Sequence, residues 1–171
     1  MSDVVYIFLD VDGVLNNENY LVRCYNRNGH RPMSLYYTPF DPKCLNNLMK
    51  LCQYLESNHL APLLILSSTW RLDKDSLIVL NARLAEYGLR IFDCTEFLEA
   101  KRGKEIKEYL ANHIRYKDYI IIDDEMFDIY KYHNLDRLIN TNFLTGFDGK
   151  ALNKALDYFE RRIINGRENK N

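Results

Sequence analysis

Strand-like and helix-like segments alternate along the chain, and this alternation constrains the fold more than any other feature of the sequence. Patterns typical of buried strands occur at 4–9, 62–66, 89–92, 119–122 and 138–139. Apolar residues at helical spacing lie between or after them, at 42–55, 77–87, 103–114 and 150–164. Strands connected through helices form parallel sheets that are covered on both faces. The sequence therefore predicts an α/β fold with a Rossmann-like parallel sheet and helices on both faces.

Length and charge limit the class of protein. The 171 residues suit one domain, and we expect a single domain over 1–171. The formal net charge of -1 argues against a polybasic binder that relies on bulk charge. The apolar runs are far shorter than the about 20 residues that cross a bilayer. The N-terminus also lacks the basic segment of a signal peptide. We therefore expect no membrane partner and a cytoplasmic location.

Polar residues and one glycine lie directly after the predicted strands and at the start of one helix. These residues are Asp10, Asp12, Gly13, Ser67, Ser68, Arg71, Lys104, Asp123 and Asp124. In parallel sheets such positions meet at the carboxyl edge, where ligands bind. Four clustered carboxylates are costly unless a cation joins them, and all-oxygen ligation suits Mg²⁺. A lysine and a hydroxyl at the same edge would hold an anion against that metal. This set of groups is typical of phosphoryl transfer through an aspartyl phosphate.

The motifs resemble those of the haloacid dehalogenase-like (HAD) phosphohydrolase superfamily over nearly the whole chain. Residues 8–14, Phe-Leu-Asp-Val-Asp-Gly-Val, look like its first motif, and Ser67 at a strand end fits the second. Lys104 fits the third motif, and the pair Asp123 and Asp124 fits the fourth. The four occur in the family's order. The resemblance implies a HAD-like fold and a HAD-type phosphatase, an enzyme that hydrolyses phosphoric monoesters.

The resemblance also implies a role for each residue. Asp10 would be the nucleophile, and Asp12 would protonate the leaving oxygen and then deprotonate the hydrolytic water. Mg²⁺, or Mn²⁺ in its place, would be held by Asp10, the backbone carbonyl of Asp12, and Asp124. We favour Asp124 over Asp123 as the direct ligand, and Asp123 would act through a water or share the ligation. The residues that would bind the phosphoryl group are Ser67, Ser68, Lys104, Gly13 and Arg71.

A finer similarity points to the small HAD domains of nucleic-acid end-repair proteins. It rests on Leu-Ser-Ser-Thr-Trp-Arg at 66–71, on Arg-Gly-Lys-Glu-Ile at 102–106, and on the turn Thr-Gly-Phe at 145–147. Fold and motif do not fix a substrate. Our hypothesis is therefore that the partner is a nucleotide or a nucleic-acid end that carries a 3′-phosphate. The alternative is a small phosphorylated metabolite.

The segment at about 16–40 is expected to be a small cap-like insertion after the first strand. Basic and aromatic residues interleave along it, namely Tyr20, Arg23, Tyr25, Arg27, Arg31, Tyr36 and Tyr37. A loop of this length without secondary structure is usually functional. Its residues could stack a base and contact phosphate, although a surface loop packed by its tyrosines explains them equally well. No comparable insertion fits between Leu89 and Lys104, which excludes a large second cap.

These residues also allow other functions and simpler interpretations. A response-regulator receiver uses similar groups, but it places its acidic pair before the phosphoacceptor, whereas here the pair comes last. A catalytically silent phosphate-binding module stays open. Ser67 could bond its own backbone, Lys104 could be solvated, and Arg71 could pair with a neighbouring acid. We expect Trp70 to pack in the core and Asp128 to make local contacts rather than bind metal.

Overall fold

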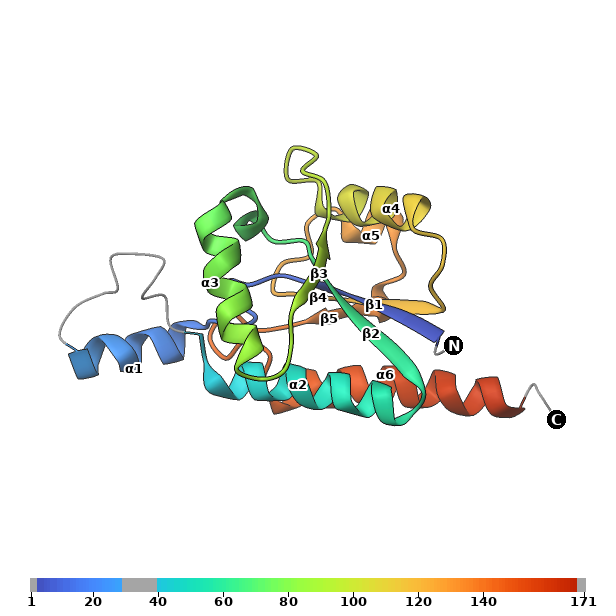
Figure 1. Ribbon diagram of the computed structural model, residues 1–171, viewed down its shortest axis with the longest axis horizontal. Helices are drawn as coiled ribbons and strands as arrows, with labels where there is room; N and C mark the ends of the chain where they lie inside the picture. Colours follow the sequence, from blue (N-terminus) through green and yellow to red (C-terminus); the bar gives the residue numbers. More distant parts are fainter. Residues whose placement is uncertain (1–2, 29–39, 169–171) are drawn as a thin grey trace.

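A computed structural model describes residues 3–28 and 40–168 of the chain. Its centre is a five-stranded sheet in the order β3-β2-β1-β4-β5, with every pairing parallel. The strands are β1 (Asp3–Leu9), β2 (Leu60–Leu66), β3 (Ile91–Cys94), β4 (Asp118–Asp123) and β5 (Leu138–Asn140). This arrangement, shown in Figure 1, confirms the predicted α/β class and the Rossmann-like parallel sheet.

Helices cover both faces of the sheet. They are α1 (Glu18–Asn28), α2 (Pro42–Ser57), α3 (Lys74–Ala85), α4 (Arg102–Asn112), α5 (Ile129–Tyr132) and α6 (Gly149–Glu168), with short 3-10 turns η2 (Thr69–Leu72) and η3 (Leu135–Arg137). In Figure 1, α2 and α6 lie below the sheet, and α4 and α5 lie above it. Within the described ranges, none of the helices is long and apolar enough to cross a membrane.

Strand alternation divides the side chains between two hydrophobic cores. On β1, Val5, Ile7 and Leu9 enter the larger core, to which α2, α3 and α6 contribute. Tyr6 and Phe8 enter the smaller core, which α4 and α5 cover. Successive residues of a strand point to opposite faces. The residue that follows Leu9 is therefore directed to the face of α4.

The segment after β1 differs from the expected loop. Its described part forms the helix α1, so the interpretation of 16–40 as structureless is wrong for Glu18–Asn28. Asn17 explains the start of this helix, because its side chain accepts a hydrogen bond from Tyr20 N and its carbonyl accepts one from Leu21 N. Residues 29–39, the rest of the predicted insertion, lie outside the described residues.

The third strand begins later than the sequence pattern indicates. It was expected at 89–92, and it spans Ile91–Cys94. The first residue of the pattern, Leu89, belongs to the turn that ends α3. Leu89 N donates to Leu84 O, and Gly88 has a φ of 70°. A glycine in this left-handed conformation commonly ends a helix, and the strand can begin only after the turn is complete.

Candidate functional site

Strand register places three predicted site residues on the same face at the carboxyl edge. Leu9 pairs with the last residue of β2 and with Ile122 of β4, so Asp10, Ser67 and Asp123 occupy equivalent positions on neighbouring strands. Asp10 N donates to Ile122 O, and Ser67 N donates to Leu9 O, each at 3.0 Å. By strand alternation, all three side chains are directed to the face that α4 covers.

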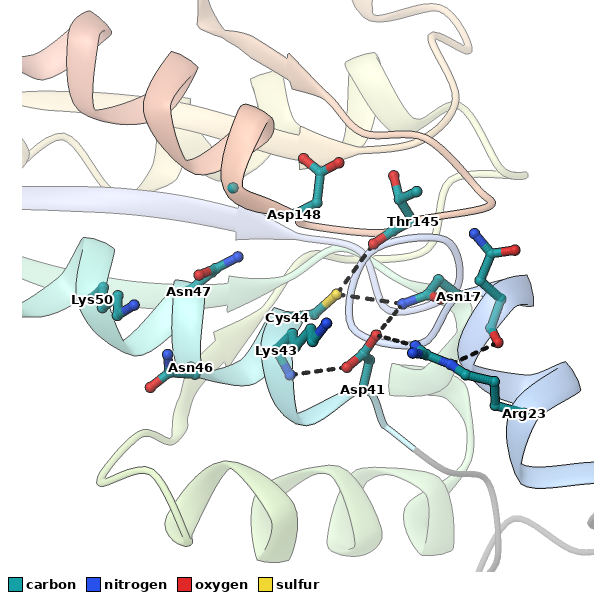
Figure 2. Close-up of a pocket in the computed structure, with 12 residues that line it drawn as sticks. Asn17, Arg23, Asp41, Lys43, Cys44, Asn46, Asn47, Lys50, Thr145 and Asp148 are labelled. Carbon is teal, nitrogen blue, oxygen red and sulfur yellow. Dashed lines mark hydrogen bonds and ion pairs between the residues drawn. The ribbon is translucent and has the colours of Figure 1, made fainter. Parts of the chain in front are cut away.

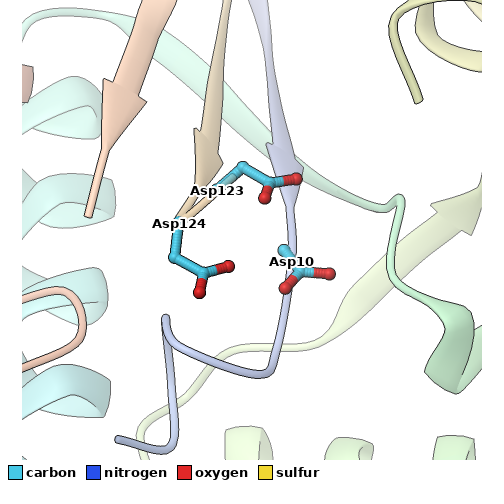
Figure 3. A group of neighbouring side chains, drawn as sticks. All are labelled: Asp10, Asp123 and Asp124. Carbon is cyan, nitrogen blue, oxygen red and sulfur yellow. The ribbon is translucent and has the colours of Figure 1, made fainter. Parts of the chain in front are cut away.

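Three carboxylates form a cluster at this edge. Asp10, Asp123 and Asp124 each offer an oxygen within 4.8 Å of the others (Figure 3). Burial raises the pKa of all three groups, to about 7 for Asp123 and about 6 for Asp124, and repulsion between the carboxylates adds to this effect. Closely held oxygen donors whose charges are incompletely compensated are suited to a hard divalent cation. The cluster therefore fits the predicted Mg²⁺ site.

Arg102, the first residue of α4, is the cation that contacts this cluster. Its Nη1 donates to Asp10 Oδ1 at 3.2 Å and also to Asp123 Oδ2. The arginine is buried, and its charge lowers the pKa of both carboxyls, although the effect of desolvation is larger. Arg102 therefore offsets part of the cost of placing two buried carboxylates side by side.

Lys104, which was expected to bind the phosphoryl group, lies half-buried in the first turn of α4. Among the described residues, the ion pairs of the Asp10 cluster are made by Arg102 and not by Lys104. Sequence reasoning missed Arg102, yet a signal for it exists. Arg102, Ile106 and Tyr109 recur at helical spacing and are all buried, whereas Lys104 is offset from that face. Arg102 lies one helical turn before Ile106 and therefore on the same face of the helix.

Glu105 connects Arg102 to the end of β2 through Arg71. Its Oε2 accepts from Arg71 Nη2 at 2.7 Å and lies 4.0 Å from Arg102 Nε. Arg71 also donates to the backbone carbonyls of Ser67 and Ser68. Arg71 was predicted to bind substrate phosphate, and the structure gives it the neighbouring acid and two carbonyls as partners. These contacts hold the segment after β2, which contains Ser67 of the second motif, against the start of α4.

The start of α4 is fixed by contacts with the segment after β4. Gly103 N donates to Asp128 Oδ1 at 2.7 Å, and His133 Nε2 donates to Gly103 O at 2.8 Å. A Cβ at Gly103 would lie 2.6 Å from the carbonyl oxygen of Asp128, so only glycine allows this approach. The expectation of local contacts for Asp128 is wrong, because its carboxylate accepts from the backbone of α4, 25 residues away, and this contact holds Arg102 beside the carboxylates.

The turn after Asp10 is shaped by Gly13. Its φ is 70°, and a Cβ at this position would lie 2.3 Å from Asp124 Oδ2. Thr141, which follows β5, donates from Oγ1 to Gly13 O at 2.8 Å. The turn can therefore pass close to Asp124 only because residue 13 has no side chain.

Asp12 lies apart from the three-carboxylate cluster and is exposed. Its Oδ1 accepts from Asn16 Nδ2 at 2.7 Å, and its Oδ2 accepts from Trp70 Nε1 at 2.9 Å. Trp70 is buried, as expected for a core residue, but it also orients this carboxylate. An exposed carboxylate that is held at both oxygens is well placed to exchange protons with a substrate and with water.

The two serines after β2 differ in their hydrogen bonds. The Ser68 hydroxyl makes a hydrogen bond that lowers the pKa of Asp10. The Ser67 hydroxyl is fully buried and has no hydrogen-bond partner among the described residues. Buried polar atoms without a partner are rare in proteins. A hydroxyl in this state, on the strand next to Asp10, is available to a phosphoryl oxygen.

The arrangement of these groups agrees with a match to a known family. Residues 6–152 match the family described as the HAD domain in Swiss Army Knife RNA repair proteins. The chain belongs to this family. A similar solved structure is a haloacid dehalogenase-like family hydrolase from Streptococcus pneumoniae, with 14% identity, a TM-score of 0.45 and coverage of 92% of this chain and 90% of that chain. A comparison with curated proteins finds no match.

Membership of the HAD family confirms the resemblance drawn from the motifs and supports a hydrolase of the HAD type. The matched range includes every predicted site residue, from Asp10 to Asp124. It also includes Arg102 and Glu105, to which the sequence motifs assigned no role in the site. The roles of the individual residues remain predictions.

This HAD domain also has a polar cavity of about 490 Å³ between α1 and the first turns of α2 and α6 (Figure 2). It is lined by Asn17, Asn19, Arg23, Asp41, Lys43, Cys44, Asn46, Asn47, Lys50, Thr145, Asp148 and Gly149. Lys43, Asn47 and Lys50 recur at helical spacing and therefore share one face of α2. The carboxylate cluster does not line the cavity. The described part of the predicted insertion thus forms one wall of a basic, amide-rich cavity.

Proposed function

We propose that the chain is a Mg²⁺-dependent phosphomonoester hydrolase that acts on the 3′-phosphate ends of nucleotides or polynucleotides through an aspartyl phosphate on Asp10. The surroundings of Asp10 carry this proposal. Two more carboxylates lie within 4.8 Å, Arg102 donates to it at 3.2 Å, and a buried hydroxyl without a partner in the described ranges, Ser67, follows the adjacent strand. A nucleophile, a cation site and anion donors together are what phosphoryl transfer requires.

The first step would form the phosphoenzyme. A carboxylate oxygen of Asp10 attacks phosphorus, the bond from phosphorus to the ester oxygen breaks, and its electron pair stays with that oxygen. Asp12, held by Trp70 and Asn16, would give its proton to the leaving oxygen. The attack requires an ionised Asp10, and the charge of Arg102 favours that form.

The second step would release phosphate. Asp12, now a carboxylate, takes a proton from water, and the water oxygen attacks phosphorus and restores Asp10. The guanidinium group of Arg102 and the Ser67 hydroxyl would donate to the phosphoryl oxygens in both steps. Asp10, Asp124 and the backbone carbonyl of Asp12 would hold Mg²⁺, with Asp123 supporting them. The ion would supply positive charge between the substrate phosphate and the carboxylates.

The family description favours a nucleic-acid end as the substrate. The matching family is named for RNA repair proteins. Backbone linkages of a nucleic acid are phosphodiesters, and only a terminal phosphate is a monoester. An enzyme with one aspartate nucleophile and a general acid for the leaving oxygen can therefore remove the terminal phosphate and leave the strand intact.

A phosphate-release screen with Mg²⁺ tests the proposal. The substrates are nucleotides, 3′-phosphorylated oligonucleotides and sugar phosphates, and Asp10→Asn is the inactive control. We expect release from nucleotides or oligonucleotides that carry a 3′-phosphate, at higher kcat/KM than from sugar phosphates. A preference for sugar phosphates would indicate the metabolite alternative, and release from no substrate would indicate a silent phosphate-binding module.

A further inference from the structure

Two exposed phenylalanine rings lie over the arginines of the active site. The ring centroid of Phe127 is 5.0 Å from Arg102 Cζ, and that of Phe97 is 5.8 Å from Arg71 Cζ. These residues are 40% and 48% exposed. Because both arginines approach Glu105 and Arg102 contacts the carboxylate cluster, the two rings flank a single charged network at the active site.

The turns that present these rings have strained backbones. Phe127 has a φ of 42°, and the loop that carries Phe97 contains Glu99 and Ala100 with φ of 55° and 58°. Left-handed conformations are unfavourable for residues with bulky side chains, and they concentrate at functional sites. Burial of Phe127 does not compensate for this strain, since the ring stays partly in solvent. The conformation leaves part of Phe127 in solvent beside Arg102.

The pairing of an exposed ring with a cation continues along α5. Lys131 Nζ lies 5.6 Å from the ring centroid of Tyr130, and Lys107 Nζ of α4 lies 5.3 Å from that of Tyr132. Both tyrosines are exposed. We use the name aromatic ridge for the set of these two tyrosines and the two phenylalanines. Figure 1 shows α4 and α5 close together above the sheet.

We propose that the aromatic ridge binds the single-stranded nucleic acid whose 3′ end enters the active site, with Phe127 stacking on the terminal base. The proposal deepens the proposed function and rests on it for the class of substrate. Phe127 has this role because its ring lies over Arg102, which contacts the nucleophile. A further base would stack on Tyr130 or on Tyr132, which lie on different sides of α5, and the lysine beside that ring would contact a backbone phosphate.

The chemistry of the ridge favours a single strand over other phosphorylated partners. Each base of a single strand has a free π-face and a neighbouring phosphate, which match a ring and the cation beside it. A duplex keeps its base faces stacked inside. A phosphopeptide offers one isolated anion and no regular series of flat rings. A sugar phosphate has no aromatic face to stack on Phe127.

Binding of an unphosphorylated, fluorescein-labelled single-stranded oligonucleotide tests the ridge without requiring activity. Because stacking of a base on an aromatic ring is lost, we expect Phe127→Ala to weaken Kd about fivefold or more in fluorescence anisotropy. Phe127→Tyr should restore binding, because it keeps the ring. Phe92→Ala, which removes an exposed phenylalanine on β3 outside the ridge, is the matched control and should bind like the unaltered chain. Equal Kd values for all variants, or equal competition by a duplex or a phosphopeptide, would overturn the proposal.

A second measurement removes the base from the substrate instead of the ring from the protein. We compare kcat/KM for 3′-phosphorylated oligonucleotides whose terminal nucleotide has a base or is abasic. The unaltered chain should favour the base by about tenfold, and Phe127→Ala should show no such preference. A preference that persists in Phe127→Ala would contradict the role of the ring. If no 3′-phosphate is hydrolysed while p-nitrophenyl phosphate is, the proposed substrate class fails, and anisotropy still decides whether the ridge binds a strand.

Discussion

The acidic pairs at the ends of β1 and β4 contain the same residue type but present it in different ways. In each pair one carboxylate is buried and contacts Arg102, namely Asp10 after β1 and Asp123 at the end of β4. The second member differs between the pairs. Asp12 is exposed and held by Trp70 and Asn16, outside the cluster, whereas Asp124 is half-buried and inside it.

This difference indicates how four aspartates could take separate roles. Asp123 accepts from Arg102 and from Glu125 N, so both of its oxygens have protein partners. Asp124 lies in the same cluster, and among the described residues the hydrogen bond that lowers the pKa of its carboxyl comes from its own backbone N–H. It is therefore the better candidate for direct metal ligation. Asp12 has solvent access and no place in the cluster, which suits proton transfer. Burial and partners, rather than residue type, separate the roles.

The largest effect is expected at the β4 pair. Without the cation, the anionic substrate meets uncompensated carboxylates, so excess chelator and Asp124→Asn should each abolish hydrolysis. Thermal unfolding supplies a second readout. Mg²⁺ should raise the Tm of the unaltered chain and of the surface control Asp75→Asn, but not that of Asp124→Asn. Full activity in excess chelator, or the same Tm increase in Asp124→Asn, would contradict the metal assignment.

A smaller but still large effect is expected at Arg102, the contact common to both pairs. Arg102→Ala removes the donor next to Asp10 and should lower kcat roughly 10²- to 10³-fold. It also leaves two buried carboxylates without their counter-ion, a change that costs about 3–5 kcal/mol in comparable sites. Arg102→Lys should retain the fold and part of the activity. The loss of activity in Arg102→Lys is compared with the loss in Lys104→Ala. A larger loss in Lys104→Ala than in Arg102→Lys would assign the phosphoryl contact to Lys104.

The difference between Arg102 and Lys104 shows what the sequence could and could not predict. The apolar runs predict the strands, and the residues directly after them predict the acidic pairs of the site. The site can be predicted in this way because a parallel sheet brings the carboxyl ends of its strands together. Which basic residue of α4 faces the cluster depends on where the helix begins and how it rotates against the sheet. Glu105 was missed for the same reason, since a buried acid is recognisable only from its arginine partners. The segment 16–40 was expected to be a loop because its many basic and polar residues give α1 no clear apolar pattern at helical spacing.

The smallest effect is expected from the segment after β1. Replacing Asn19 to Thr38 with a short Gly/Ser linker removes α1 and one wall of the polar cavity. It should spare hydrolysis of p-nitrophenyl phosphate and weaken that of the natural substrate roughly two- to fivefold, because exposed ionic contacts contribute at most about 1 kcal/mol. Arg23→Gln, a variant that keeps the helix, tests the basic wall separately. Unfolding of the deletion variant would show that the segment belongs to the core, and unchanged kinetics on both substrates would show that it is a passive cover.

Pre-steady-state hydrolysis of p-nitrophenyl phosphate distinguishes the role of Asp10 from that of Asp12. Asp10→Asn cannot form the phosphoenzyme and should show no nitrophenolate burst and no turnover. Asp12→Asn lacks only the acid–base group, a loss of roughly 10²- to 10⁴-fold where proton transfer matters. Because p-nitrophenolate leaves without a proton, this variant should still phosphorylate itself.

Asp12→Asn should therefore release a burst of nitrophenolate approaching one equivalent per enzyme, followed by slow turnover. Its activity on alkyl or sugar phosphates, whose leaving oxygen needs a proton, should be lost already in the first step. A burst that survives Asp10→Asn, or equal losses in Asp12→Asn on activated and unactivated esters, would contradict the division of roles between the two residues.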